Sequence, residues 1–544
     1  MDKDAVRSVL EHVAAFLALK GEESAARIRA YQDAARAELA ATGRSTTLDE
    51  LREQIPPGLG EMLRIPGLGV AKVRQINEQL HIESLAELED AAVDGRLAAL
   101  PRFGPKAAEN VRKGIAALRE GSAFRLLHHA LAEAESIARG LAALDGVRRV
   151  DIAGSVRRRR EIIRDLDFVV VYAGEAGGTR DALIKRLDDA PGVIELAGKQ
   201  GGLTLRFASG TVVDVFLTPE SEAGLSLLRA TGSLEHVAQL EAYARTRGVA
   251  LEPGSAWPDE ESVYRAVGLP WIAPEVREGM GEIGAAAAGR LPRLLEQRDL
   301  KGFLHCHTNY SDGTTTVAEW AEACRAAGYE WMGITDHSES SAYAGGLRAE
   351  HVARQHAEID AANRRHDDFR ILKGVEADIL ADGSLDYGPA VLDRFDFVIA
   401  SIHTRFGMSE AEMTTRVLRA LDDPHTTILG HPTGRLLLSR DPYAIDMEQV
   451  LERAALRGVA VEVNADPHRL DLDWRMVRRA RELGGAVPIS LGADAHSVAG
   501  MTNVALGVAI ARKGWLEADD VLNTRDAEGF LALARRRRPP PVYA

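Results

Sequence analysis

The sequence predicts a multidomain chain of the α and α/β classes that ends in a barrel. The length of 544 residues corresponds to roughly three or four domains of about 150 residues each. Helical segments separated by Pro-Gly turns fill residues 1–120, whereas strand-like runs rich in Val, Ile and Leu begin near residue 147. From residue 302 onward such runs alternate with helical segments, a pattern typical of parallel strands joined by crossover helices.

The composition is that of a globular protein, with 46% hydrophobic and 27% charged residues. No apolar run approaches the roughly 20 residues of a membrane span, and the N-terminus lacks a secretory signal pattern, so we expect a cytoplasmic protein. The two cysteines, Cys306 and Cys324, exclude a disulfide framework and a cysteine-rich zinc site. The net charge of −14 argues against a uniformly basic nucleic-acid binder, although the Arg runs 157–160 and 535–538 permit local basic patches.

The N-terminal region contains two Gly-containing turns, "IPGLGVAKV" (65–73) and "LPRFGPKAAENV" (100–111), each directly before a predicted helix. Such a turn exposes backbone N–H groups at a helix N-terminus, which can bind a phosphate without reading a base. The alternative is an ordinary helix–helix connection. The repetition of the turn favours DNA-backbone binding, for which the predicted residues are Gly67, Gly69, Gly104 and Lys106.

The central α/β region, residues 121–218, carries the segment "GSVRRRREIIRDLD" and, later, "VVDV". Asp165 and Asp167 share a face if their segment is extended, and Asp214 on another strand can complete a carboxylate cluster that holds two Mg²⁺ ions. The Gly-Ser pair and the basic run before them can bind phosphates through backbone N–H groups and Arg side chains. The alternative is that both aspartates face solvent at a strand start.

The C-terminal region begins with "FLHCH", in which His305 and His307 share one side of an extended segment while Cys306 points away. A His-x-His pair by itself is equally compatible with surface or core packing. In a parallel barrel, however, the carboxyl ends of all strands share one rim. The ligand-type residues at those ends are His305, His307, Asp312, His337, Glu376, His403, His431, Asp494 and His496.

These nine residues predict a metal centre at the barrel rim, because packing does not explain so many histidines and carboxylates at strand ends. Nitrogen and carboxylate ligands without thiolates suit zinc, manganese or iron, and their number permits several ions. A multinuclear site of this kind is typical of phosphoester hydrolysis, in which metal ions activate water and stabilise the leaving oxygen.

The segments "HCHTNYSDG", "TDH", "GVEAD", "SIH", "GHP" and "DAH" resemble the motifs of the polymerase-and-histidinol-phosphatase (PHP) superfamily. The resemblance covers residues 300–510 and implies a distorted (βα)7 barrel with up to three Mn²⁺ or Zn²⁺ ions. By this resemblance, the first ion has the ligands His305, His307, Glu376 and Asp494. The second ion shares Glu376 with His403 and His431, and the third has Asp312, His337 and His496.

The upstream segments resemble family X DNA polymerases: the carboxylate segment is similar to their nucleotidyltransferase palm, and "TGSLEH" (231–236) to their thumb. The resemblance implies Asp165, Asp167 and Asp214 as catalytic ligands of Mg²⁺ or Mn²⁺. The implied nucleotide-binding residues are Gly154, Ser155, Arg158, Thr231 and Gly232. The implied domains are a shortened helix-hairpin-helix region (1–120), a palm (121–218), a thumb (219–285), a linker (286–300) and a PHP domain (301–544).

The chain departs from the family pattern in the nucleotide pocket. Arg164 stands where the family has Gly, Phe216 replaces an Arg, and Val237 replaces an Asn. Arg229 and Ala230 replace a Tyr-Phe pair before "TGS". We expect these changes to weaken nucleotide binding and sugar selection, because positioning supplies much of the rate of phosphoryl transfer.

The N-terminal region is shorter than in the family and lacks the lysine used for 5′-deoxyribose-phosphate lyase chemistry. Gln75 stands at the expected position, and Lys72 lies off it.

The expected function is DNA repair by gap-filling DNA synthesis from deoxynucleoside triphosphates on gapped or nicked duplex, with 3′–5′ exonuclease or 3′-end processing by the PHP domain. We expect a monomer. Three alternatives stay open: a polymerase-impaired nuclease or phosphatase whose palm only positions DNA, a small-molecule phosphatase of the histidinol-phosphatase type, and a non-enzymatic DNA-end binding module. Structural zinc sites usually have four closed ligands, so a rim of nine argues against the last.

Overall fold

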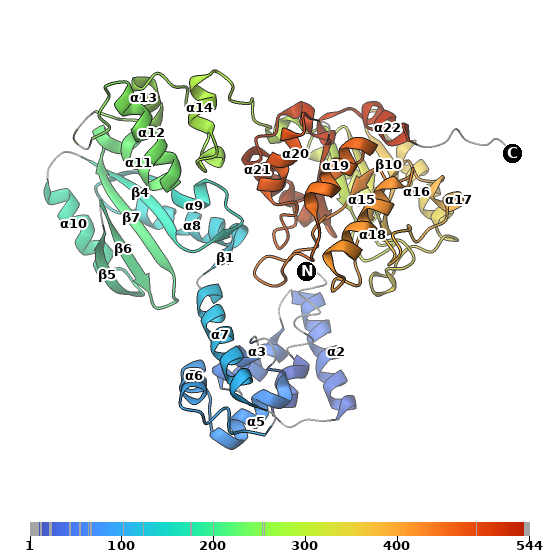
Figure 1. Ribbon diagram of the computed structural model, residues 1–544, viewed down its shortest axis with the longest axis horizontal. Coiled ribbons are helices and arrows are strands. Elements are labelled where there is room, and N and C mark those ends of the chain that lie inside the picture. Colours follow the sequence, from blue (N-terminus) through green and yellow to red (C-terminus); the bar gives the residue numbers. More distant parts are fainter. Residues whose placement is uncertain are drawn as a thin grey trace. The chain divides into compact units, whose positions relative to one another are not determined.

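The computed structural model describes residue 10 and residues 13–537, apart from residues 21–23, 43–44, 54–55, 64, 66–67, 102, 123, 174–176, 200, 253, 255 and 486. The chain forms two compact units, Met1–Ala123 and Phe124–Ala544 (Figure 1). Among the residues so described, no helix is long and apolar enough to cross a membrane.

The first unit is helical, as predicted. Its described helices are α2 (Ala25–Thr42), α3 (Thr46–Glu53), α4 (Pro57–Met62), α5 (Val70–Leu80), α6 (Leu85–Val93) and α7 (Pro105–Ser122). Helix α6 begins with a capping box, in which the Ser84 side chain accepts from the Glu87 backbone and the Glu87 carboxylate accepts from the Ser84 backbone. Apolar side chains such as Met62, Ile76 and Ile115 form one buried core between the helices.

The second unit begins with a five-stranded sheet of order β2-β4-β7-β6-β5. Its strands are β2 (Val147–Ile152), β4 (Leu166–Tyr172), β5 (Val193–Lys199), β6 (Gly202–Phe207) and β7 (Val212–Pro219). Strands β4 and β7 are parallel neighbours, and Asp167 is paired with Asp214. The sequence did not predict β5, because this edge strand is half exposed and has no apolar run.

Helices flank the sheet and continue beyond it. A short pair of strands, β1 (Arg125–Leu126) and β3 (Ile162–Ile163), also lies beside them. The helices near the sheet are α8 (Leu127–Ala142), α9 (Gly154–Arg157) and α10 (Gly177–Asp188). After β7 follow α11 (Ala223–Thr231), α12 (Leu234–Thr246), α13 (Glu260–Ala266) and α14 (Glu282–Ala287). Leu240, Val263 and Ile272 are fully buried in a separate core of this helical part.

The C-terminal part is a closed barrel of seven parallel strands, which confirms the predicted barrel (Figure 1). Its strands are β8 (Gly302–Cys306), β9 (Trp331–Ile334), β10 (Arg370–Asp378), β11 (Phe397–Ser401), β12 (Ile428–Leu429), β13 (Ala460–Asn464) and β14 (Ile489–Ala495). The surrounding helices are α15 (Val317–Ala326), α16 (Val352–Asn363), α17 (Pro389–Leu392), α18 (Glu410–Asp422), α19 (Met447–Arg457), α20 (Trp474–Glu482), α21 (Val504–Lys513) and α22 (Ala527–Arg535).

The barrel closes because β14 pairs with β8, with Gly492 opposite Leu304. Apolar side chains pack between strands and helices, and Trp320, Val375 and Leu491 are fully buried there. This arrangement brings the carboxyl ends of all seven strands to one rim, at which the predicted metal ligands lie.

Candidate metal centre of the barrel and carboxylate cluster of the sheet

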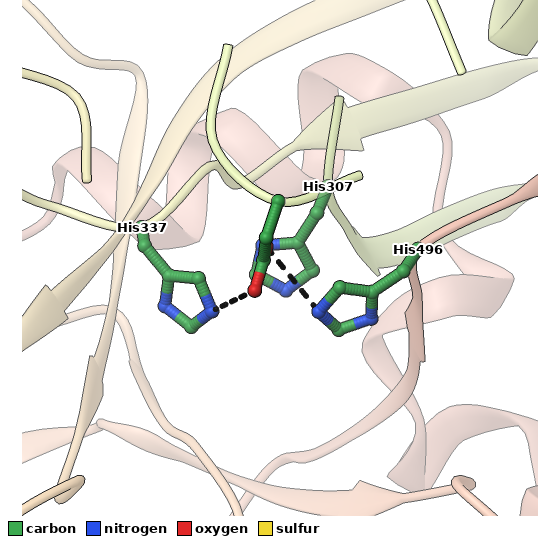
Figure 2. A group of neighbouring side chains, drawn as sticks. His307, His337 and His496 are labelled. Carbon is green, nitrogen blue, oxygen red and sulfur yellow. Dashed lines mark ion pairs between the residues drawn. The ribbon is translucent and has the colours of Figure 1, made fainter. Parts of the chain in front are cut away.

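The predicted ligands of the barrel converge at its rim. Figure 2 shows the rings of His307, His337 and His496 turned toward one another. The ligand atoms of these three histidines and of Asp312 all lie within 4.8 Å of one another. The same holds for His305, His307 and Glu376 and for His337, Glu376 and His403. The three groups therefore share the residues His307, His337 and Glu376.

Glu376 lies at the centre of the rim. Its Oε1 is 2.9 Å from His431 Nε2, 3.2 Å from His403 Nε2 and 3.4 Å from His305 Nε2. Its Oε2 is 2.8 Å from His337 Nδ1, whereas the resemblance assigned His337 to the third ion with Asp312. Both ring nitrogens of His337 are thus near carboxylates, and the assignment of ligands to individual ions stays a prediction.

The backbone at the rim is less regular than the simple strand pattern predicted. His305 has a φ of 58° and Asp494 a φ of 48°, so neither residue is extended. The pairing of β8 with β14 shifts between Gly492 and Ala495. His305 Nε2 and His307 Nε2 still lie 3.6 Å and 3.2 Å from Asp494 Oδ1, because these turns aim both rings at one carboxylate.

Further buried carboxylates are hydrogen-bonded to the predicted ligands. Sequence reasoning missed these carboxylates. His305 Nδ1 lies 2.5 Å from Glu462 Oε1, and the His431 backbone donates to Glu462 Oε2 at 2.7 Å. Asp378 is hydrogen-bonded to His403 Nδ1. The signal was present: Asp378 follows Glu376 by two residues on β10 and therefore faces the same side of the strand.

Burial and charge shift the protonation of these groups strongly. Burial opposes charge on Glu376, but His403, His337 and His305 hold the pKa of its carboxyl well below the usual value. Burial, together with His496 and His337, lowers the pKa of His307 to about 3. Burial opposes a proton on His496, yet Asp312 and Asp494 raise its pKa to about 9. Ionised carboxylates and a neutral His307 are the ligand forms that a cation needs.

Several predicted ligand atoms of the rim are placed as metal ligands would be, because hydrogen bonds within the protein do not satisfy them. His305 Nε2 and both ring nitrogens of His307 are buried and make no well-directed hydrogen bond within the described residues. Buried polar atoms are normally paired, so such atoms indicate a missing ligand. Nitrogen and carboxylate donors suit Mn²⁺ or Zn²⁺, and two of the histidines, His305 and His403, are hydrogen-bonded through Nδ1 to a further carboxylate.

The carboxylates predicted at the central sheet also lie together. Asp167 on β4 and Asp214 on β7 are direct cross-strand neighbours. Burial, Asp165 and Asp214 raise the pKa of Asp167 to about 7. A Cβ on Gly154 would lie 1.7 Å from Asp167 Oδ2, so only glycine permits this contact between the loop and the cluster. The cluster can therefore hold divalent cations, which would neutralise its charge.

A lysine that sequence reasoning missed already contacts this cluster. The Lys199 ammonium is ion-paired with Asp214 Oδ2, and Thr204 Oγ1 donates to Asp214 Oδ1 at 2.5 Å. Lys199 Nζ also lies 5.3 Å from the ring centroid of Phe216, the residue that replaces the family's Arg. The cation beside Asp214 thus comes from the edge strand β5, which pairs with β6 and which the sequence did not reveal as a strand.

The predicted nucleotide-binding residues surround the same end of the sheet. Arg158 is hydrogen-bonded through Nη1 to the Thr231 carbonyl, and its Nε lies 3.2 Å from Glu278 Oε1. Gly232 lies beside it, because a Cβ there would be 3.0 Å from Arg158 Nη1. Ser155 Oγ is buried with no hydrogen-bond partner within the described part of the chain. These residues lie together, with Arg158 already paired to protein groups.

The residues that depart from the family pattern lie in different environments. Arg229 donates to Glu241 Oε1 at 2.8 Å and to the Leu251 carbonyl at 2.7 Å. Arg164 is exposed, and Ala230 packs partly buried against the apolar cluster of Ala153 and Leu227. Val237 packs against the core of the helical part after β7. Arg229 and Val237 thus serve as structural contacts in this chain.

The two Gly-containing turns of the first unit lie before α5 and α7. Gly67 falls outside the described residues. Gly69 is the exposed N-cap of α5, Gly104 directly precedes α7, and Lys106 in the first turn of α7 is exposed. Lys72 of α5 lies 5.6 Å from the Phe103 ring of the second turn.

The rim and the sheet cluster have the residue types of two metal-dependent phosphoryl-transfer sites, and comparisons with known proteins agree. Residues 304–465 match the PHP domain family, residues 59–117 a SAM-like helix-hairpin-helix tandem, and residues 226–278 the DNA polymerase beta thumb. The DNA polymerase/3′-5′ exonuclease PolX of Bacillus subtilis is 36% identical over 502 residues, which cover 90% of this chain and 87% of the relative.

Other relatives match a smaller share of this chain. A probable phosphatase of Thermoanaerobacter sp. is 27% identical over 231 residues, 40% of this chain and 89% of the relative. A probable phosphatase of Vibrio parahaemolyticus is 30% identical over 253 residues, 44% of this chain and 96% of the relative. With the match to PolX and the three domain matches, the chain belongs to the family X DNA polymerases that carry a helix-hairpin-helix region, a polymerase beta thumb and a C-terminal PHP domain.

Proposed function

We propose that this chain fills gaps in DNA at the sheet cluster and processes 3′ ends by metal-dependent hydrolysis at the barrel rim. The similarity to PolX along 90% of the chain supports both activities. The observation that carries the hydrolase is the convergence of histidines and carboxylates on Glu376, with buried ligand atoms that make no hydrogen bond within the described structure. The cofactors proposed for the rim are up to three Mn²⁺ or Zn²⁺ ions.

At the barrel, residues of this chain would bind the metal ions and orient the ligand side chains. Bound metal ions would activate a water and stabilise the oxygen that leaves the phosphorus. The buried ligand set holds Glu376 ionised and His307 neutral, so that both are ready for cations. Glu462 and Asp378 fix the rings of His305 and His403 by hydrogen bonds to their Nδ1 atoms.

At the sheet, Asp165, Asp167 and Asp214 are the proposed ligands of Mg²⁺ or Mn²⁺ for nucleotidyl transfer from deoxynucleoside triphosphates. The raised pKa of Asp167, about 7, supports a cation site, because a bound cation would keep this carboxyl ionised. Ser155, Arg158 and Gly232 are the proposed triphosphate contacts. Since Arg158 is paired with Thr231 and Glu278, nucleotide binding has to compete for its guanidinium.

The Gly-containing turns are the proposed binding sites for the DNA backbone. A Cβ at Gly69 or Gly104 would meet no described atom within 4 Å, so packing inside the protein does not require glycine there. A phosphate that approaches the backbone does require it, and the N-termini of α5 and α7 favour an anion. A monomeric state and a cytoplasmic location stay predictions.

The test of the hydrolase uses a 5′-labelled oligonucleotide with a 3′-hydroxyl end, incubated with Mn²⁺ and no nucleotides. We expect the wild type to shorten the strand, and His305→Ala to lower the rate at least about 100-fold, since each ligand helps to hold the metal. His366→Ala is the matched control, because this histidine lies outside the rim. Equal shortening by wild type and His305→Ala would refute the hydrolase.

The relatives named as probable phosphatases favour a second candidate function, in which the rim removes phosphate groups from phosphomonoesters. A 3′-phosphorylated oligonucleotide and histidinol phosphate separate the two substrate classes. Release of phosphate from histidinol phosphate alone would support a small-molecule phosphatase, whereas processing of the oligonucleotide end supports the DNA-repair function.

A further inference from the structure

A pocket of about 470 Å³ lies next to the proposed metal ligands. It is lined by two loops, one that follows β11 and carries His403, and one that follows β12 and carries His431. Its lining includes Phe406, Met408, Gly434, Arg440 and Tyr443. This volume falls in the range of small-ligand sites, roughly 300–1,000 Å³.

Three flat groups, those of Phe406, Arg440 and Tyr443, contribute to the pocket wall. The rings of Phe406 and Tyr443 are almost parallel, with an interplanar angle of 14° and centroids 6.1 Å apart. The Arg440 guanidinium carbon lies 4.4 Å from the centroid of the Phe406 ring. Arg440 is held in this place because its Nε and Nη2 donate to the Gly434 carbonyl at 2.9 Å and 2.6 Å. The pocket therefore has a fixed stacking surface rather than a loose apolar hollow.

The pocket wall contacts the turn that follows His431, one of the proposed metal ligands. The Gly434 backbone donates to the carbonyl of His431 at 3.0 Å, and the Tyr443 hydroxyl donates to the Pro432 carbonyl at 2.6 Å. A Cβ on Gly434 would lie 2.6 Å from the Tyr443 ring and 3.5 Å from the Phe406 ring. Glycine at this position therefore keeps the rings against the turn that follows a ligand.

We propose that this pocket binds the base of the 3′-terminal nucleotide while the phosphodiester beside it lies at the metal centre. The proposal rests on the hydrolase function proposed above. Stacking on Phe406 and Arg440 accepts any base, because every base has a π face. Phe406 is half-buried, so it can offer a ring surface to a ligand. The base pocket would hold the terminal nucleotide in register for removal.

The test compares oligonucleotides that end in a normal nucleotide with oligonucleotides that end in a tetrahydrofuran abasic residue. Since stacking favours binding of a base, we expect the wild type to cleave the normal end roughly 10-fold faster. Phe406→Ala should lower that rate about 10-fold and leave the abasic end unchanged, whereas Phe406→Tyr should keep the difference. Leu438→Ala, an exposed residue of the loop after β12 that lies outside the pocket lining, is the control.

The outcomes separate the pocket from the hydrolase. If the wild type cleaves neither end, the hydrolase function itself fails. If it cleaves both ends at equal rates, the hydrolase stands and the base pocket is refuted. If Phe406→Ala slows both ends equally, the ring only supports the barrel rim, and the proposal is overturned as well.

Discussion

Single residues behind the ligands decide how well the rim can bind metal. Glu462 is fully buried and contacts the ring of His305, the backbone of His431 and, at 3.2 Å, the side-chain amide of Asn464. Gly492 makes room for it, since a Cβ there would lie 1.8 Å from Glu462 Oε1. One carboxylate thus orients two ligands that come from different strands.

Glu462→Gln is predicted to lower metal affinity of the barrel by about 10-fold to 100-fold, because the amide orients His305 less firmly and makes its ring less basic. Equilibrium dialysis against Zn²⁺ measures the affinity. Glu452→Gln, an exposed change on α19, serves as control. Unchanged affinity in Glu462→Gln would show that His305 needs no such support.

That the predicted ligands cluster at one rim could be expected from the sequence, because they end predicted strands and the strand ends of a parallel barrel meet. Glu462 was not predictable in the same way. It lies in the middle of β13, where an inward and an outward glutamate look alike in sequence, and only the register of the barrel places it behind His305.

At the scale of elements, a buried ion network joins the sheet to the helices that follow it. Glu260 at the start of α13 accepts from Arg157 of α9 at 2.7 Å and from the fully buried Arg277 at 2.6 Å. Burial opposes charge on Glu260, but the hydrogen bonds of both arginines lower its pKa to about 2. The network therefore depends on an ionised Glu260.

Glu260→Gln is predicted to reduce the free energy of unfolding by about 3 kcal/mol at pH 7, because it leaves the buried Arg277 and the part-buried Arg157 without their anion. The folded pKa of Glu260 lies below its unfolded value of about 4.3, so its contribution is present above that pH and is lost as the pH falls toward about 2. Chemical unfolding between pH 2 and 7 measures it. A difference between wild type and Glu260→Gln that does not shrink in acid would contradict this.

Elements with strong patterns were predicted from sequence, and elements defined by tertiary pairing were not. The strands of the barrel were recognisable as apolar runs bounded by ligand residues. Strand β5 was missed because its exposed residues come in adjacent pairs and do not alternate with buried ones, and with it the contact of Lys199 with Asp214 was missed.

At the scale of the second unit, one carboxylate connects three parts of the fold. Glu278 lies 3.2 Å from Arg158 Nε and 3.4 Å from Arg160 Nη1, both at the sheet, and is ion-paired with Lys513 of α21 on the barrel. Lys513 is only 1% exposed. A lysine buried to this degree needs its anion, so the contact holds the barrel against the sheet domain.

Glu278→Gln is predicted to loosen this contact, because it leaves Arg158, Arg160 and Lys513 without their shared anion. Limited proteolysis of the connecting segment 286–300 should become several-fold faster, while the exposed change Glu261→Gln should leave the rate unchanged. Equal cleavage rates in all three proteins would show that the connection does not depend on Glu278. The sequence could not reveal this link, because its partners are more than 230 residues apart in the chain.

The central claim is that one chain carries two independent phosphoryl-transfer sites, and a labelled primer on a gapped duplex tests it most directly. With Mn²⁺ and deoxynucleotides, we expect the wild type to lengthen the primer and, without nucleotides, to shorten it. Asp214→Ala should only shorten the primer, and His305→Ala should only lengthen it. A wild type that never lengthens the primer, or loss of both activities in either variant, would contradict the account.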